Sequence, residues 1–265
     1  MISSLFILLL TGLVVGFFAG LLGIGGGAIM VPALTAYFLW QGFDTSVVVH
    51  LALATSMSCI VFNALISIRT HQKHHAILWS IFIQMAPAVL IGSTLATVFV
   101  LKIESKSVAL VFMVLMFLVA IQMVVNFKPK PSTSSKLNKP ILLSGGFIIG
   151  LLSAMIAIGG GSLTVPFLHW YQVKIPKAIA TAAAIGLPLA LSACVVYIIQ
   201  GWHQGGLPPH TIGYIYWPAT CALCLGSVFT TSIGANLTHR WPVKMIKRIF
   251  ALLISLLAIK MYFTF

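Results

Sequence analysis

The sequence has almost no acidic side chains. Of its 265 residues only Asp44 and Glu104 carry a carboxylate, and charged residues of both signs make up 6% of the chain against 60% hydrophobic residues. Soluble domains carry about 25% charged residues, so this class is excluded. The sequence also lacks an acid pair, an H-E-x-x-H zinc motif and a G-x-S-x-G nucleophile motif. We therefore expect an integral membrane protein that is not an enzyme.

The charge that remains is positive. Fifteen Lys and Arg residues against two acids give a formal net charge of +13. The basic residues stand between apolar runs rather than on one soluble face, which argues against nucleic acid as a partner. The lipid bilayer is the partner that this pattern predicts.

Cysteine is scarce, and no cofactor or metal site is expected. The four cysteines lie inside apolar runs, where a small packing residue is the better interpretation even of the C-x-x-C at Cys221 and Cys224. His71, His74 and His75 could ligate a metal, but their short basic surroundings favour a solvated loop.

Ten apolar runs predict an all-α, polytopic fold with five helical segments in each half. Nine of them contain no Lys, Arg, Asp or Glu, and the last, 249–264, contains one charged residue, Lys260. Two of them are too short to span a bilayer, because a span needs about 20 residues. The runs are 5–23, 28–40, 46–68, 77–101, 107–126, 140–158, 162–173, 178–200, 211–237 and 249–264.

An internal repeat organises the chain. Residues 16–34 read GFFAGLLGIGGGAIMVPAL and residues 150–168 read GLLSAMIAIGGGSLTVPFL, with an offset of 134 positions and 8 identities in 19. Three consecutive glycines make a poor helix interior, so each copy predicts a helical hairpin broken at the glycines. Broken apolar segments at equivalent places in two halves indicate a transporter binding site. Close helix packing by small residues is the simpler alternative.

The basic residues predict the topology. The polar segment 127–139 is the expected linker between a first repeat, 1–126, and a second repeat, 140–265. With this linker in the cytoplasm, 12 of the 15 Lys and Arg residues fall inside and both termini fall outside. Five segments per half is an odd number, so we expect the second repeat to be inverted relative to the first.

A small anion is the substrate that the glycine breaks could bind. A helix that begins inside the protein presents unpaired N–H groups and the positive end of its dipole, and such a terminus binds oxyanions without a charged side chain. Hydroxyls just after the breaks could line the passage, whereas Gln122, Gln84 and Asn236 are expected to bond between helices. The predicted substrate-binding residues are Gly25, Gly26, Gly27, Gly159, Gly160, Gly161, Ser162, Thr55, Ser56 and Thr181.

These motifs resemble the sulfite exporter TauE/SafE family over essentially the whole chain. The similar features are the doubled G-I-G-G-G with its following V-P, the A-T-S and A-T at 54–56 and 180–181, and IGANLTHRWPVKMIKRIF from Ile233. The resemblance implies a transporter of a small sulfur-containing or organic anion, such as sulfite, thiosulfate or a sulfonate. It implies an exporter in the bacterial inner membrane.

Two other functions remain open at this stage. A membrane scaffold or assembly subunit would use the same small-residue surfaces and would need no internal polar cavity. An intramembrane serine hydrolase would need Ser162 hydrogen-bonded to a histidine in a water-filled cavity.

Overall fold

The computed structural model describes residues 2–125, 137–238 and 243–262. The described residues form ten helices and one two-stranded sheet, which confirms the predicted all-α class. The helices are α1 (Ile2–Leu22), α2 (Gly27–Trp40), α3 (Thr45–Lys73), α4 (Trp79–Val100), α5 (Ser105–Val125), α6 (Lys139–Met155), α7 (Gly161–Trp170), α8 (Ile175–Gly201), α9 (Trp217–Leu237) and α10 (Val243–Tyr262).

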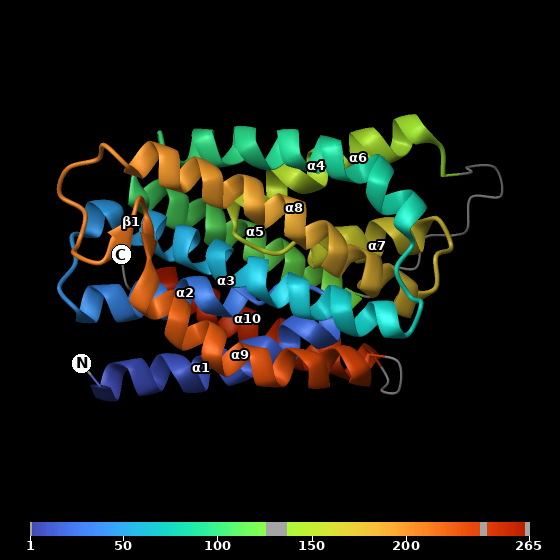
Figure 1. Ribbon diagram of the computed structural model, residues 1–265, viewed down its shortest axis with the longest axis horizontal. Coiled ribbons are helices and arrows are strands. Elements are labelled where there is room, and N and C mark those ends of the chain that lie inside the picture. The colour runs from blue at the N-terminus through green and yellow to red at the C-terminus, as the bar shows by residue number, and fades with distance from the viewer. Residues whose placement is uncertain (1, 126–136, 239–242, 263–265) are drawn as a thin grey trace.

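The helices lie side by side along the long axis of one bundle (Figure 1). Helices α1 and α3 begin at the left-hand end of the picture, whereas α6 and α8 begin at the right-hand end. Both labelled chain ends lie at the left, and α3 connects to α4, and α7 to α8, at the right. In this view α1 and α3 therefore run in the opposite direction to α6 and α8.

Polar residues at the bundle ends start the helices. The Asp44 carboxylate accepts a hydrogen bond from the Ser46 N–H at 2.8 Å at the start of α3, and the Asn138 side chain accepts from the Ile141 N–H at 3.3 Å at the start of α6. Each side chain satisfies a backbone N–H that the helix itself leaves unpaired. The apolar runs that follow these two caps continue as α3 and α6.

Helices from different halves pack on each other through glycines. Helix α1 packs along α9, and α6 packs along α4. A Cβ added at Gly12 would collide with the backbone of Leu223, and one at Gly146 would lie 2.9 Å from the Met85 carbonyl oxygen. Gly146 follows Gly12 by 134 positions, and Leu223 follows Met85 by 138. Glycine is needed at these places because the helix backbones touch.

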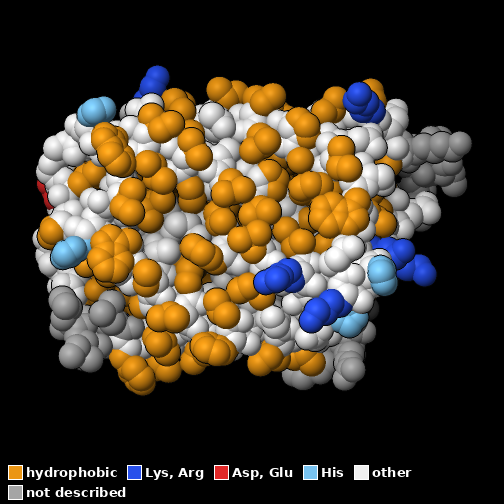
Figure 2. Space-filling view, in the orientation of Figure 1, with side chains coloured by type: hydrophobic (Ala, Val, Ile, Leu, Met, Phe, Trp, Pro, Cys, Tyr) orange, Lys and Arg blue, Asp and Glu red, His pale blue; other side chains and the backbone are white. Residues whose placement is uncertain are grey.

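The surface of the bundle suits a lipid environment. Figure 2 shows hydrophobic side chains spread over the length of the visible face, with most of the visible Lys and Arg side chains toward its right-hand end. Five of the described helices are long and apolar enough to cross a membrane, namely Thr45–Lys73, Trp79–Val100, Ser105–Met123, Ile175–Gly201 and Trp217–Leu237. The protein is an integral membrane protein, as the composition predicts.

Two details differ from the sequence-based prediction, and one predicted segment lies mostly outside the described residues. The predicted apolar run 211–237 is helical only from Trp217, because β1 (Thr211–Ile212) and β2 (Ile215–Tyr216) form a hairpin that turns at Gly213. His71 is fully buried within α3 instead of lying in a solvated loop. Most of the predicted linker, 127–136, lies outside the described residues.

Candidate functional site

The two glycine loops cross in the middle of the bundle. Residues 23–26 join α1 to α2, and residues 156–160 join α6 to α7. The Gly159 N–H donates to the Ile24 carbonyl oxygen at 2.9 Å. A Cβ added at Gly25 would lie 3.0 Å from the Gly159 Cα, and one at Gly159 would lie 2.9 Å from the Gly25 Cα. The two loops thus touch backbone to backbone, as only glycine permits.

The glycines at the ends of the loops start the short helices. Gly26 and Gly160 are the N-caps of α2 and α7, with φ of 86° and 80°, a left-handed conformation that favours glycine. The next residues, Gly27 and Gly161, each abut a carbonyl of the other loop, and a Cβ on either would collide with it. At 1.5 Å per residue the 14 residues of α2 and the 10 of α7 span about 21 and 15 Å. Neither length crosses a hydrocarbon core of about 30 Å.

Both short helices begin with unpaired donors. In α7 the N–H groups of Leu163 and Thr164 bond to the Gly160 carbonyl, but among the described residues no carbonyl accepts the N–H of Gly161 or Ser162. In the first loop the N–H groups of residues 24–28 have no such partner either. Each terminus adds the positive end of a helix dipole, worth about half a charge.

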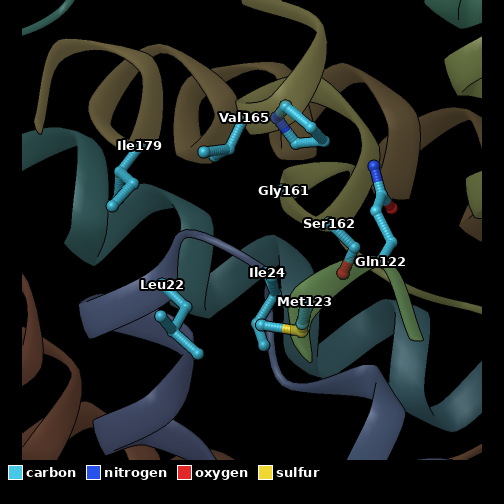
Figure 3. A pocket seen from close by; sticks show the side chains of 9 residues that line it. Leu22, Ile24, Gln122, Met123, Gly161, Ser162, Val165 and Ile179 are labelled. Carbon is cyan, nitrogen blue, oxygen red and sulfur yellow. The ribbon is translucent and has the colours of Figure 1, made fainter. Parts of the chain in front are cut away.

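A cavity of about 40 Å³ adjoins the start of α7 (Figure 3). The Ser162 hydroxyl faces the end of the cavity at which Gln122 also lies. Ser162 is 7% exposed, and its Oγ has no hydrogen-bond partner among the described residues. One water needs roughly 10–15 Å³ on this measure, so the cavity has room for a few waters or one small oxyanion group. The residues that line it are Leu22, Ile24, Gln122, Met123, Gly161, Ser162, Val165, Pro166 and Ile179.

A larger groove adjoins this cavity. Its volume is about 480 Å³, and it lies between α5, α6 and α7. The groove and the inner cavity share two lining residues, Gln122 and Pro166. The other residues of the groove are mostly apolar or aromatic, namely Ile141, Ser144, Gly145, Ile148, Ile149, Leu152, Leu163, Phe167, Trp170 and Tyr171.

A second, smaller cavity lies at the crossing itself. It has a volume of about 10 Å³, enough for one water. Gly25 and Gly159 line it together with the polar side chains of Asn63 and Ser67. The Asn63 amide donates to the Gly25 carbonyl oxygen at 3.4 Å, which ties the middle of α3 to the first loop.

The predicted site residues fall into two groups. The six glycines of the breaks and Ser162 come together at the crossing, and Gly161 and Ser162 line the 40 Å³ cavity. The hydroxyl residues of α3 and α8, which are Thr55, Ser56 and Thr181, line neither cavity nor the groove.

The two threonines hold the starts of other helices. The Thr55 Oγ1 accepts a hydrogen bond at 3.1 Å from the N–H of Tyr216, the N-cap of α9. The Thr181 Oγ1 accepts one at 3.0 Å from the N–H of Leu78, the N-cap of α4. The recurrence of this pair in the sequence thus coincides with two equivalent capping contacts, each made across the two halves.

Gln122 is the lining residue that the sequence analysis assigned to another role. It was expected to bond between helices, but it lines both the cavity and the groove. A signal was present in the repeat, because A-I-Q-M at 120–123 recurs as A-I-K-M at 258–261, an offset of 138. The equivalent of Gln122 in the last helix is Lys260.

Among the described residues, no charged side chain lines the cavities or the groove. Hydrogen bonds from Ser46, above all from its backbone N–H, hold the pKa of Asp44 below its ordinary value, but Asp44 lies at the end of the bundle. The serine–histidine bond that a hydrolase at Ser162 would need is not made in the described chain. Around the 40 Å³ cavity the described residues offer the backbone, the Ser162 hydroxyl and the Gln122 amide as polar groups for binding.

Comparison with known proteins agrees with this architecture. The family model of the sulfite exporter TauE/SafE matches residues 8–261. A "probable membrane transporter protein" of Haemophilus influenzae is 33% identical over 262 residues, which cover 99% of both chains. Similar proteins of the same description in Methanocaldococcus jannaschii and Bacillus subtilis are each 26% identical, over 91% and 95% of this chain and 89% and 96% of theirs.

No solved structure gives a significant match. The family match covers nearly the whole chain, and the relative from Haemophilus influenzae aligns with it from end to end. The chain belongs to the sulfite exporter TauE/SafE family of membrane transporters.

Proposed function

We propose that the protein transports a small oxyanion that binds at the start of α7. The observation that carries this proposal is the buried Ser162 hydroxyl, which faces a cavity and has no protein partner in the described chain. Beside it are the unpaired N–H groups of Gly161 and Ser162. Three donors and a helix dipole converge on one cavity, and these are the groups that bind an oxyanion in the absence of a cation.

The expected binding free energy fits a substrate that must also be released from the site. A hydrogen bond to a charged group contributes about 1.5–3 kcal/mol, and the dipole adds up to about 2 kcal/mol in a partly buried setting. The desolvation of the anion opposes these gains. A transporter needs such a moderate balance, because a site with a buried arginine would hold its anion too tightly. The family's description makes sulfite the first substrate to test, and thiosulfate and sulfonates, which the sequence resemblance implies, are tested beside it.

We also infer two inverted repeats, 1–126 and 140–265, with the segment 127–139 in the cytoplasm. The opposite directions of α1 and α3 relative to α6 and α8, and the equivalent pairings of α1 with α9 and α6 with α4, support this inference. Most basic residues then lie on the cytoplasmic side, in what we take to be the bacterial inner membrane. The groove borders α7 on that side. An inside-negative potential favours anion exit by about 2.3 kcal/mol per charge per 100 mV, so export is the proposed direction.

A scaffold or assembly subunit is the second candidate. It would account for the glycine packing of α1 on α9, but it gives no reason for a polar cavity at the start of α7. The cavity therefore favours transport over assembly.

Anion flux into proteoliposomes tests the proposal. Purified protein should carry sulfite, thiosulfate or a sulfonate, and Ser162→Ala should weaken the apparent affinity about tenfold or more, since one charge-assisted hydrogen bond is lost. Ser153→Ala is the matched control, because the Ser153 hydroxyl is equally buried and unpartnered but lines no cavity. Equal affinities for Ser162→Ala and Ser153→Ala would contradict the proposed site.

A further inference from the structure

Gln122 occupies the point where the groove meets the inner cavity. It lies on α5 and is one of two residues that line both spaces, the other being Pro166. The polar side chains around the inner cavity are Ser162 and Gln122, which lie at the same end of it (Figure 3). The Gln122 side chain therefore borders both spaces, beside the serine at the start of α7.

The charge that the site can offer is small. None of the described residues that line the cavity or the groove is charged, so among them the helix dipole, worth about half a charge, is the main electrostatic attraction. The cost of taking an ion out of water grows with the square of its charge, whereas its attraction to a dipole grows only linearly. A monovalent anion can balance these two terms, but a divalent one of similar size cannot.

The protein's own repeat shows how the position could carry a charge. Residues 120–123 read A-I-Q-M and the equivalent residues 258–261 read A-I-K-M, so Lys260 stands where Gln122 stands in the other half. The same helix register thus carries an ammonium in one half and a neutral amide in the other. The neutral residue lies at the cavity whose serine hydroxyl lacks a partner.

We propose that Gln122 determines specificity by keeping the α7 site neutral, so that the site prefers monovalent oxyanions, such as a sulfonate or hydrogensulfite, to divalent ones such as thiosulfate. The amide can donate to an anion oxygen without adding charge. A lysine here would supply the charge that a dianion needs. This inference rests on the proposed anion site at α7 and adds the charge class of its substrate.

The test compares two oxyanions of sulfur that differ in charge. Methanesulfonate is monovalent and sulfate is divalent near neutral pH, and both present a tetrahedral sulfur with three or four oxygens. We expect the full-length protein in nanodiscs to bind methanesulfonate at least tenfold more tightly than sulfate. Gln122→Lys should shift this ratio toward sulfate by at least tenfold. Gln122→Glu, which has nearly the same shape, should abolish binding of both anions through like-charge repulsion.

Gln84→Lys is the matched control, because Gln84 is a half-buried glutamine of α4 that lines none of these spaces. The ratio of the Gln84→Lys protein's affinities for methanesulfonate and sulfate should equal that of the unmodified protein. Wild-type protein that binds both anions equally, or an unchanged ratio in Gln122→Lys, would overturn the role of Gln122. If Ser162→Ala still abolishes binding in that case, the α7 site stands; if Ser162→Ala also has no effect, the site itself is wrong.

Discussion

Gly25 and Gly159 face each other across the crossing of the two loops, each so close that a methyl group on one would press on the Cα of the other. The residues occupy equivalent positions in the internal repeat, 134 apart. This contact fixes the two short helices relative to each other. The start of α2 rests on one loop and the start of α7 on the other, so neither can be placed without the opposite half.

The crossing should not tolerate a single methyl group. We expect Gly27→Ala to lower the apparent melting temperature in detergent by at least about 5 °C, since overpacking a tight core costs about 1–3 kcal/mol. The new Cβ would collide with the Ala157 carbonyl, which is backbone and cannot move aside cheaply. Gly205→Ala is the control, because open space surrounds Gly205 and it should melt as the unmodified protein does. A Gly27→Ala protein as stable as the control would refute the tight crossing.

The trans-capping threonines should matter for stability through their hydroxyls. Thr55→Val keeps the shape but removes the acceptor for the Tyr216 N–H, and leaving a buried donor unpaired costs about 1–3 kcal/mol. Thr55→Ser should restore most of the melting temperature. The same series at Thr181, where the donor is the Leu78 N–H, should give the same order. If the serine variants melt as low as the valine variants, the hydrogen bonds are not the cause.

The two carboxylates should not carry a coupling proton. The Ser46 N–H lowers the pKa of Asp44, so this carboxylate is ionised throughout pH 5–8 and has no proton to exchange there. A lowered pKa stabilises the folded protein above the ordinary value near 3.8, and this contribution is lost as the pH falls through the lowered value. Asp44→Asn keeps a capping side chain. Flux by the double variant with Glu104→Gln should match the unmodified protein between pH 5 and 8, and a lost pH dependence would show that a carboxylate is involved.

The proposed topology can be tested with two cysteines in a background without the native four. Lys177 precedes most of α8, and Gly205 lies beyond its other end. A membrane-impermeant maleimide should label Gly205→Cys in intact cells but Lys177→Cys only after permeabilisation. Labelling of both positions from the same side would be inconsistent with α8 as a membrane span.

Much of the architecture could be predicted because it depends on composition and repetition. Apolar runs bounded by polar residues predicted nearly all the helices, and the doubled glycine motif predicted two equivalent breaks. The hairpin at 211–216 was missed because its Thr-Ile and Ile-Tyr strands look like the start of an apolar helix. A pairing of two residues per strand leaves no periodicity in the sequence.

The site could be predicted only in part. The glycines were found because a break in an apolar run is a local signal, whereas their contact partner is another loop 134 residues away. Thr55 was assigned to the substrate path because its recurrence was visible and its partner, the Tyr216 N–H, was not. The residues next to Gln122 in the sequence do not indicate a binding role. This role depends on the cavity and the groove that α5 borders in the folded protein.

The pairing of α1 with α9 has a consequence for how the protein is made. The glycine face of α1, at Gly12 and Gly16, packs on α9, which leaves the ribosome about 200 residues later. At roughly 5–20 residues per second this delay lasts about 10–40 seconds. During that time the glycine face of α1 lacks the helix on which it packs in the folded protein. The same glycine face could also pack on α9 of a second newly made chain. Slow synthesis or a truncated message should therefore favour domain-swapped dimers over monomers.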